Sequence, residues 1–339
     1  MRGKNILITG GAGFIGSNFV EYFLNTYTQT KIIILDKLTY AGELSNLSEH
    51  QTHPNYYFEK GDICDKNKLE EVFNKYKITD IIHFAAESHV DNSINKPDEF
   101  INTNVVGTFN LLEIAKRNWL EQPHKIKEGF ENCRFLHIST DEVYGTLGKT
   151  GLFTETTAYA PNSPYSASKA SSDFLVRSYF HTYGLNVVTT NCSNNYGPKQ
   201  HDEKLIPTII RKAINNENIP IYGDGQNIRD WLYVMDHCKG IDLAFQNGKA
   251  GETYNIGGKN ERNNLYIANI ICEILDELVP KDKPYKDQIT FVSDRPGHDF
   301  RYAIDASKIE NELGWKADEN FESGIKKTIN WYLKKYKAI

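Results

Sequence analysis

The sequence ILITGGAGFIG (residues 6–16) places a short apolar run directly before a turn that contains four glycines. A strand, a glycine-rich turn and the start of a helix, in this order, are typical of a dinucleotide-binding unit. Glycines let the backbone approach a pyrophosphate, whose charge is met by free N–H groups at the helix N-terminus. Glycines also form ordinary tight turns, so the prediction depends on the flanking strand and helix. We expect cofactor contacts at Gly10, Gly13, Phe14, Ile15 and Gly16.

Asp36 ends the second apolar run and lies 20 residues beyond Gly16. A carboxylate there can accept hydrogen bonds from a ribose diol and repel a 2′-phosphate, which predicts NAD rather than NADP. A solvated acid after a structural turn would leave the same pattern. Asp62 and Ile63 could flank the adenine, although a surface aspartate beside a core isoleucine would look the same.

Short β-branched runs alternate with helical stretches over the first 195 residues. This alternation predicts an α/β fold with a Rossmann-type doubly wound parallel sheet, in which the strands are buried on both faces. The expected strands lie at residues 6–8, 32–35, 81–84, 135–138 and 187–189. The expected crossover helices lie at residues 14–27, 66–75, 104–118 and 166–183.

The pattern changes after about residue 195. We expect a helix at 205–215, a turn-rich segment at 219–225, and amphipathic helices at 265–278 and 321–336. Two short runs, residues 231–234 and 254–257, could rejoin the sheet. The predicted division is a cofactor domain of residues 1–195 plus about 230–260. A smaller, discontinuous α/β domain of about 196–229 plus 261–339 would bind the substrate.

Composition excludes several classes of partner. A net charge of −5 gives no electrostatic reason to expect nucleic acid or an anionic membrane. No apolar run approaches the ~20 residues needed to span a bilayer, and the N-terminus lacks a signal peptide's apolar region. Five widely spaced cysteines favour reduced thiols in a cytoplasm over disulfides or a metal site. We also expect no metal at His298, since its segment shows no second ligand at a suitable spacing.

Two clusters carry the candidate chemistry. Tyr165 and Lys169 lie four residues apart near the start of a predicted helix and therefore share one face. A nearby ammonium and the nicotinamide charge would lower the pKa of the phenol and make it a usable base, although YxxxK alone is a common pattern. Thr140, Asp141 and Glu142 follow the strand at 135–138, at the sheet edge where such folds place their chemistry. A solvated turn or a helix cap is the alternative explanation for these acids.

The chain resembles the extended short-chain dehydrogenase/reductases, of the nucleotide-sugar epimerase/dehydratase family, and within them the dTDP-glucose 4,6-dehydratases. The resemblance covers nearly the whole chain. Beyond the glycine turn, it rests on residues 36–42, 85–91, 140–142, 165–169, 191–198, 204–207, 229–231 and 294–299. The pair Asp141 and Glu142 distinguishes the dehydratases from related epimerases, because the epimerases share the glycines, the tyrosine and the lysine but lack the acid pair.

This resemblance implies a lyase mechanism. Tyr165 would deprotonate the sugar's carbon-4 hydroxyl while NAD⁺ accepts the carbon-4 hydride, with Thr140 positioning the oxygen and Lys169 tuning the phenol. Glu142 would remove the carbon-5 proton and Asp141 would protonate the departing carbon-6 hydroxyl, before hydride returns to carbon 6. Because one carboxyl is an acid and the other a base, we expect their pKa values to be pushed apart, with that of Asp141 raised.

The resemblance also implies contact residues. Further cofactor contacts would be Lys37, Leu38, Thr39, Ala85, Ala86, Ser88, Thr103, Tyr165, Lys169 and Asn195. The substrate, a nucleotide sugar such as dTDP-glucose, would be held by Ser88, Thr140, Asn194, Lys204, Leu205, Ile206, Pro207, Pro220, Tyr222, Arg229, Asn264, Arg295 and His298, with Tyr302 nearby. Residues 199–203 depart from the expected pattern beside this site. Nothing in the residues separates thymine from uracil on physical grounds.

Three other readings stay open at this point. A UDP-sugar 4-epimerase needs no elimination acids, and a UDP-glucuronate decarboxylase must bind a carboxylate. A catalytically silent NAD-sensing protein could share the fold. The family also forms homodimers by pairing two helices of each subunit into a four-helix bundle, which would involve the helices beginning at Asn104 and Ser166 here.

Overall fold

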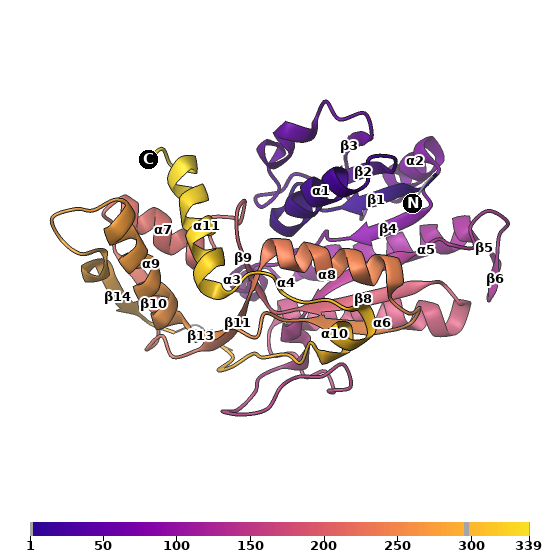
Figure 1. Ribbon diagram of the computed structural model, residues 1–339. Helices are drawn as coiled ribbons and strands as arrows, with labels where there is room; N and C mark the ends of the chain where they lie inside the picture. The colour runs from indigo at the N-terminus through magenta and orange to yellow at the C-terminus, as the bar shows by residue number, and fades with distance from the viewer. Residues whose placement is uncertain (1–2, 295–297, 339) are drawn as a thin grey trace.

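A seven-stranded parallel sheet forms the centre of the protein, in the computed structural model that describes residues 3–294 and 298–338 (Figure 1). Its strand order is β12-β8-β7-β4-β1-β2-β3. The strands are β1 (Asn5–Thr9), β2 (Lys31–Asp36), β3 (Tyr56–Lys60), β4 (Asp80–His83), β7 (Phe135–Thr140), β8 (Val187–Cys192) and β12 (Thr253–Ile256). All neighbouring pairs are parallel, which confirms the predicted Rossmann-type sheet.

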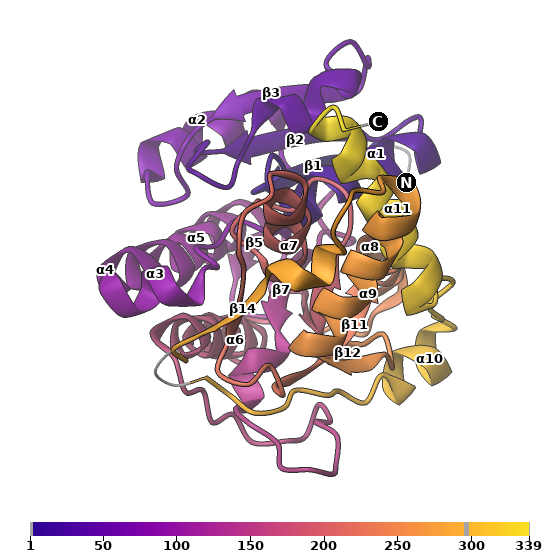
Figure 2. The ribbon, with the colours of Figure 1, turned by 90° about the vertical axis from the view of Figure 1, so that its left-hand side faces the viewer.

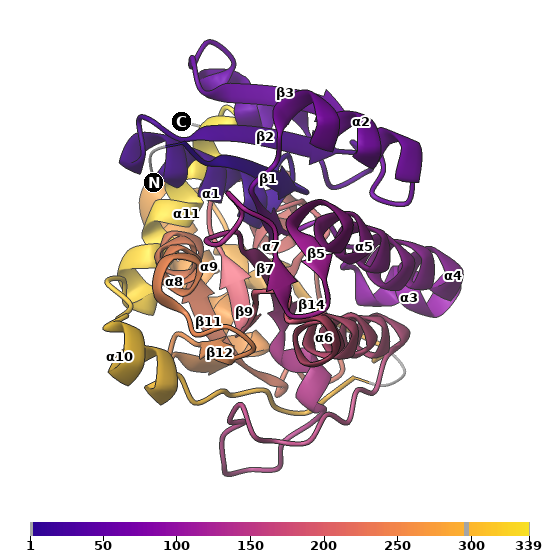
Figure 3. The same cartoon turned by 90° about the vertical axis from the view of Figure 1, so that its right-hand side faces the viewer.

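Helices cover both faces of this sheet, as Figure 3 shows. One face packs against α1 (Phe14–Thr26) and α8 (Val234–Asn247). The opposite face packs against α2 (Lys66–Tyr76), α5 (Thr108–Trp119) and α6 (Pro164–Tyr183). Because side chains alternate along a strand, β1 sends Ile6 and Ile8 into the first layer and Leu7 into the second. The strands therefore need apolar residues at every position, as predicted.

The chain reverses direction across the sheet beside β1. It runs outward through β2 and β3, then returns to β4 on the other side of β1 and continues to β7, β8 and β12. In open α/β sheets, the crevice at the carboxyl ends of the strands beside such a switch is the usual ligand site. The fold thus places a crevice between the ends of β1 and β4.

A second group of elements packs beside the sheet, at the left of Figure 1 and facing the viewer in Figure 2. It contains α7 (Leu205–Ile214), α9 (Asn264–Leu278) and α11 (Phe321–Lys335), with β10 (Ile219–Tyr222) paired to β14 (Ile289–Val292). A separate three-stranded sheet has the order β13-β11-β9, from Glu261–Asn263, Ile228–Tyr233 and Asn194–Tyr196. The buried side chains of residues 196–333 in this group form their own apolar core.

Shorter elements connect these layers. They are the 3₁₀ turns η1 (Leu44–His50), η3 (Asp141–Tyr144) and η4 (Tyr285–Gln288), helices α3 (Val90–Asn95), α4 (Pro97–Phe100) and α10 (Ser307–Leu313), the π-helical turn η2 (Ile101–Gly107), and the hairpin of β5 (Leu120–Gln122) and β6 (Lys125–Ile126). Within the described ranges, no helix is long and apolar enough to cross a membrane.

The structure corrects several element predictions. Residues 254–257 do supply an edge strand of the main sheet, but residues 231–234 do not, because β11 pairs with β9 and β13 instead. The segment 219–225 begins with the strand β10 rather than a turn, since it gains β14 as a distant partner. The helix expected from Asn104 starts earlier, as η2, and α8 was not predicted. The boundary between the two domains stays a prediction.

Candidate active site

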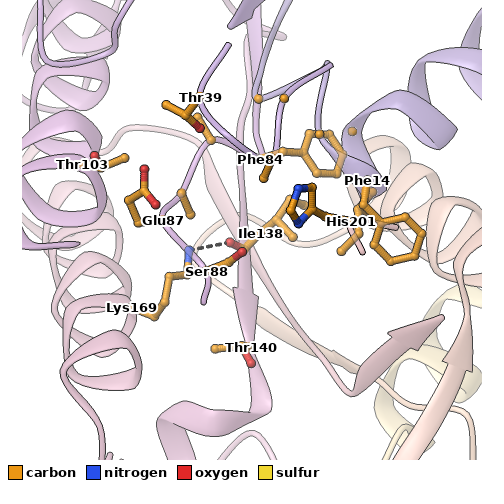
Figure 4. A pocket seen from close by; sticks show the side chains of 18 of the residues that line it. Phe14, Thr39, Phe84, Glu87, Ser88, Thr103, Ile138, Thr140, Lys169 and His201 are labelled. Carbon is orange, nitrogen blue, oxygen red and sulfur yellow. Dashed lines mark hydrogen bonds between the residues drawn. The ribbon is translucent and has the colours of Figure 1, made fainter. Parts of the chain in front are cut away.

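A pocket of about 310 Å³ lies at the carboxyl ends of β1, β4, β7 and β8 (Figure 4). Its volume is at the lower end of the range common for small-molecule sites. The ends of these strands and of β2 and β3, with the segments that follow them, supply most of its lining, so segments far apart in the chain meet at one edge of the sheet. The glycine-rich turn forms one end of the pocket, and Tyr165 with Thr140, Asp141 and Glu142 lies at the other.

The glycine turn leaves no room for side chains at two positions. Gly10 has a φ of +71°, and a Cβ there would lie 2.6 Å from the backbone nitrogen of Ala85. A Cβ on Gly16 would lie 2.3 Å from the carbonyl oxygen of Gly10. No described side chain caps the start of α1 at Gly13, so its first N–H groups face the pocket as anion donors. This end therefore fits a phosphate group.

Asp36 is held in place at the end of β2 by backbone donors. Its Oδ2 accepts from the Ala12 N–H at 2.9 Å, and its Oδ1 accepts from the Leu38 N–H at 2.8 Å. Burial raises the pKa of this carboxyl, and the two backbone hydrogen bonds oppose that shift. The carboxylate lines the pocket beyond the glycine turn, as a ribose-binding acid should.

Asp62 and Ile63 also line the pocket, at the rim beyond Asp36. The Lys37 ammonium lies 2.8 Å from Asp62 Oδ2, so the aspartate is part of an ion pair and not an isolated surface acid. Ile63 packs against the end of η2, where a Cβ on Gly107 would approach its Cδ1 to 2.5 Å. Both residues line the pocket and both also have structural partners, so their contact with an adenine stays a prediction.

The opposite end of the pocket is built on α6. Ser163 caps this helix through a reciprocal pair of bonds with Ser166, and Pro164 occupies its first turn. Tyr165 and Lys169 then lie on the same face, buried against the end of β7. The Lys169 Nζ donates to the carbonyl oxygen of Ile138 at 2.8 Å, the dashed contact in Figure 4.

The pKa of Tyr165 depends on burial and on neighbouring groups. Burial raises the pKa of its phenol well above the usual value, the negative charge of Glu142 adds to that shift, and a hydrogen bond with Thr140 opposes it. The lowering predicted from Lys169 together with the nicotinamide charge stays a prediction for the NAD-bound site, while in the protein alone this pKa is raised. The reason is that desolvation of a phenolate in the interior exceeds the effect of a lysine whose proton is directed at a backbone carbonyl.

Thr140, Asp141 and Glu142 form the start of the 3₁₀ turn η3. The Thr140 hydroxyl accepts from the Glu142 N–H at 3.3 Å, which fixes the turn against the end of β7. Asp141 is buried, and its Oδ2 has no hydrogen-bond partner among the described residues. Burial raises the pKa of Asp141 well above its usual range, and the charge of Glu142 acts in the same direction. Burial therefore favours the protonated form of Asp141, which is the direction predicted for an acid.

The structure brings most predicted residues into this pocket. Besides the five catalytic candidates, the lining includes Gly10, Gly13, Phe14, Ile15, Gly16, Asp36, Lys37, Thr39, Asp62, Ile63, Ala85, Ala86, Ser88, Thr103, Asn194, Asn195 and Lys204. Leu38 is outside the lining and contributes its N–H to Asp36. Lys204 reaches across the pocket and donates to the carbonyl oxygen of Ser88 at 3.0 Å.

Most residues predicted to hold the nucleotide lie away from this pocket. Leu205, Ile206, Pro207, Pro220, Tyr222, Asn264 and His298 belong to the second group of elements or its connections, and Arg295 is outside the described residues. The guanidinium of Arg229 is buried, stacks on the Tyr302 ring at 4.3 Å and donates to the carbonyl oxygens of Ile228 and Asp299. These bonds hold the segment around Asp299, and the positive charge of Arg229 opposes the rise that burial causes in the pKa of Asp141.

His298 is paired with an acid after all. Its Nδ1 lies 2.7 Å from Asp294 Oδ1, four residues earlier, so the premise that its segment lacks a nearby carboxylate was wrong. Two such groups do not make a metal site, and the described part of the chain contains no set of three or more ligating side chains that could hold an ion.

Several pocket residues were not predicted. They are Leu35, Ala41, Gly42, Gly61, Phe84, Glu87, Ile138, Ser139, Cys192, Ser193, Gln200, His201 and Glu203. The last three come from the stretch 199–203 that departs from the family pattern. The His201 ring packs edge-on against Tyr40, and Glu203 lies between His201 and His89. The run of five polar residues at 199–203, next to a motif segment, was the signal available in the sequence.

Comparisons with known proteins agree on one family. The family model described as GDP-mannose 4,6 dehydratase matches residues 7–328. A dTDP-glucose 4,6-dehydratase of Salmonella typhimurium is 56% identical over 97% of this chain and 92% of that protein. The Bacillus anthracis dTDP-glucose 4,6-dehydratase, solved in complex with NAD, is 48% identical with a TM-score of 0.85 over 98% of both chains. The Streptomyces venezuelae enzyme of the same name, also with NAD bound, is 42% identical with a TM-score of 0.89 over 98% of both chains.

Proposed function

The chain belongs to the dTDP-glucose 4,6-dehydratase family, and we propose that it converts dTDP-glucose into dTDP-4-keto-6-deoxyglucose. The reaction oxidises carbon 4, removes water across carbons 5 and 6, and reduces carbon 6, with no net redox change. One observation carries this proposal: the buried Asp141 and its neighbour Glu142 face the same pocket as Tyr165 and the glycine turn. An acid pair at this position serves an elimination, which an epimerase does not need.

The cofactor proposed for the pocket is NAD. The glycine turn supplies N–H donors at the start of α1, its Gly10 and Gly16 have no room for a Cβ against the neighbouring backbone, and Asp36 presents a carboxylate at the ribose position. When bound, NAD⁺ accepts a hydride from the sugar and returns it. The carboxylate of Asp36 would repel a 2′-phosphate, which supports NAD over NADP.

Tyr165 is the proposed base for the carbon-4 hydroxyl. Its phenol shares the pocket end with Thr140, whose hydroxyl bonds to it and can hold the sugar oxygen in line. Lys169 supplies a buried positive charge on the same helix face. Burial raises the pKa of Tyr165, so deprotonation requires positive charge nearby, from Lys169 and from the oxidised nicotinamide.

Glu142 and Asp141 are the proposed elimination pair. Once carbon 4 is a ketone, the carbon-5 proton becomes acidic because the resulting carbanion is an enolate. Glu142 takes this proton, and Asp141 gives its own proton to the carbon-6 hydroxyl, which leaves as water. Carbon 5 is reprotonated once hydride has returned to carbon 6. Burial raises the pKa of Asp141, so the carboxyl holds the needed proton near neutral pH.

The test is a product analysis without added reductant. The purified protein is incubated with dTDP-glucose carrying deuterium on carbon 4 and separately with UDP-glucose, and the products are separated by chromatography before their masses are measured by mass spectrometry. We expect a product lighter by one water from dTDP-glucose, with deuterium from carbon 4 recovered on carbon 6. An isomer of unchanged mass would indicate an epimerase, and unchanged substrates would indicate a silent NAD-binding protein. Either result contradicts the proposal.

We propose the nucleotide contacts on the second group of elements by resemblance. Lys204 and Arg229 are cations near the pocket, and α7 begins at Leu205 directly after Lys204. This arrangement is consistent with a diphosphate that leaves the pocket past Lys204 and a base that lies toward α7 and β10. The proposed division into a cofactor domain and a smaller substrate domain would then place the reacting sugar between them.

We further propose a homodimer formed through α5 and α6. Apolar side chains on η2, α5 and α6 are exposed in one subunit, with Ile101 48%, Val106 41%, Phe109 38% and Phe174 58% exposed. Apolar patches of this kind favour burial against a partner. Light scattering of the purified protein should give twice the chain mass, and Phe174→Glu should shift the measured mass toward that of one chain.

Free thiols at all five cysteines support the proposal of a reducing cytoplasm.

A further inference from the structure

A third ionisable residue continues the line of Tyr165 and Lys169 on α6. Asp173 follows Lys169 by four residues, so the three side chains lie on one face over two turns of the helix. Asp173 is 5% exposed and lies outside the pocket lining. It therefore cannot touch a ligand in the pocket directly, and any role in the reaction has to pass through other residues.

Both carboxylate oxygens of Asp173 are hydrogen-bonded. Oδ2 accepts from the Ser139 hydroxyl at 2.9 Å and from the Tyr159 hydroxyl at 3.0 Å. Oδ1 lies 3.0 Å from the Nε2 of His137. Ser139 and His137 belong to β7, and Tyr159 belongs to the loop between η3 and α6. The carboxylate thus joins α6 to the strand that ends at Thr140.

Lys169 is hydrogen-bonded to the same strand, at the residue that precedes Ser139. Its Nζ donates to the carbonyl oxygen of Ile138, while Asp173 accepts from the side chain of Ser139. Burial lowers the pKa of Lys169, and the charge of Asp173 opposes that shift. The buried ammonium is therefore kept in its charged form partly by Asp173, which is one turn away on its own helix.

The other ionisable groups around this pair come from β4, β7, β8 and the loop before α6. They are His83, His137, Cys192, Tyr144 and Tyr159, with Asp141 and Glu142 beyond them. Burial lowers the pKa of both histidines and raises the pKa of the thiol and of both phenols. These five groups are consequently neutral near pH 7, and burial also raises the pKa of Asp141. Asp173 is the carboxylate that balances Lys169.

We infer that Asp173 is a positioning residue for the proposed dehydration: it keeps Lys169 protonated and holds the Tyr165 helix against the strand end that carries Thr140, Asp141 and Glu142. This inference rests on the proposed function. It assigns no contact with substrate to Asp173. The predicted consequence is a change in the titration of Lys169, which a residue that merely fills the core would not cause.

The experiment compares Asp173→Asn with Asp242→Asn. Asp242 is a matched control because it is also a buried carboxylate on a helix, and it accepts from the hydroxyls of Tyr22 at 3.0 Å and Tyr27 at 2.7 Å. It lies outside the pocket. The titration of Lys169 is followed by NMR of isotope-labelled lysine in the NAD-loaded protein, with the resonance assigned from Lys169→Met. The pH profile of dTDP-glucose dehydration is measured in parallel.

In Asp173→Asn we expect the Lys169 pKa to fall by about one unit or more, since one nearby opposite charge typically shifts a pKa by ~1–3 units. The alkaline limb of the activity profile should move to lower pH by a similar amount, and Asp242→Asn should leave both unchanged. An unaltered Lys169 titration in Asp173→Asn would overturn the inference while the wild-type activity stands. Absence of dehydration in the wild type would instead overturn the proposed function.

Tyr159→Phe provides a second route if Asp173→Asn does not fold. Burial raises the pKa of Asp173 to about 6, and the bond from Tyr159 opposes that rise. Loss of the hydroxyl should therefore raise the Asp173 pKa further. The charge on Asp173 is lost as pH falls through about 6 in the wild type, so the linked step in the Lys169 titration should appear at higher pH in Tyr159→Phe. If that step stays at the same pH in Tyr159→Phe, the inference is contradicted.

Discussion

The two ends of the pocket are built from different chemical groups, backbone at one end and side chains at the other. At the glycine end the backbone makes the site, because N–H groups point at the ligand and positions such as Gly10 and Gly16 have no space for a Cβ. At the catalytic end buried side chains make it, and burial shifts the pKa of Asp141, Tyr165 and Lys169. Phosphate binding needs donors whose charge never changes, whereas proton transfer needs groups that titrate. Substitutions should therefore act on binding at one end and on chemistry at the other.

The largest effect is expected at the acid pair. Glu142→Gln and Asp141→Asn each remove one proton-transfer group and should slow elimination by about 10²–10⁴-fold. Oxidation at carbon 4 should persist, because Tyr165 and the glycine turn are untouched. Reduced nicotinamide should therefore accumulate in a single turnover, which its absorbance reports. Full dehydratase turnover in either variant would remove the assignment of these residues.

The glycine end should respond in binding instead. In Gly16→Ala the new Cβ would lie 2.3 Å from the Gly10 carbonyl oxygen, and relieving such overpacking typically costs about 1–3 kcal/mol. We expect NAD affinity, measured by calorimetry, to fall by about tenfold or more. Gly148→Ala is the control, because a Cβ there meets no atom within 4 Å. Equal NAD affinity in the two variants would show that the turn does not approach the cofactor.

The catalytic end should also show a cost in stability. In the unfolded chain Asp141 ionises near pH ~4, while burial raises its pKa in the folded state. As pH rises above ~4, the unfolded state loses a proton that the folded state keeps, so the free energy of unfolding falls toward the folded pKa. Asparagine has no such proton. Asp141→Asn should thus gain stability relative to the wild type as pH rises from ~4 to ~7, by about 1.4 kcal/mol for each pH unit over which only the unfolded state has lost the proton.

Urea unfolding of both proteins at the two pH values measures this gain. A difference between variant and wild type that is the same at both values would show that Asp141 is not buried as a neutral acid. Gly16→Ala, which changes no titratable group, should give a pH-independent difference. The two measurements therefore distinguish an end of the pocket built from backbone groups from an end built from side chains whose pKa values are shifted by burial.

The sequence predicted the glycine end more fully than the catalytic end. A local motif defines the turn, and the acid at residue 36 follows from strand spacing, so both could be recognised from neighbouring residues. The raised pKa of Tyr165 could not, because it depends on burial against Phe100 of α4 and on the charge of Glu142, both of which lie well before Tyr165 in the chain. Arg229 is a similar case: its motif suggested a phosphate, yet its bond to Asp299 comes from a chain segment 70 residues later. The separate sheet of β11 could not be predicted for the same reason, since its partners β9 and β13 are distant from it in the sequence.

The smallest effect is expected at the rim of the glycine end. The Lys37 ammonium lies 2.8 Å from Asp62, but its side chain is 59% exposed, and exposed ion pairs contribute about 0–1 kcal/mol. Lys37→Ala should therefore lower NAD affinity by less than about fivefold, and the difference from the wild type should shrink as salt screens the pair. Calorimetry at low and high ionic strength measures both. A loss above tenfold that persists in salt would mean that the lysine side chain contacts the cofactor directly, and that this end also relies on a charged side chain.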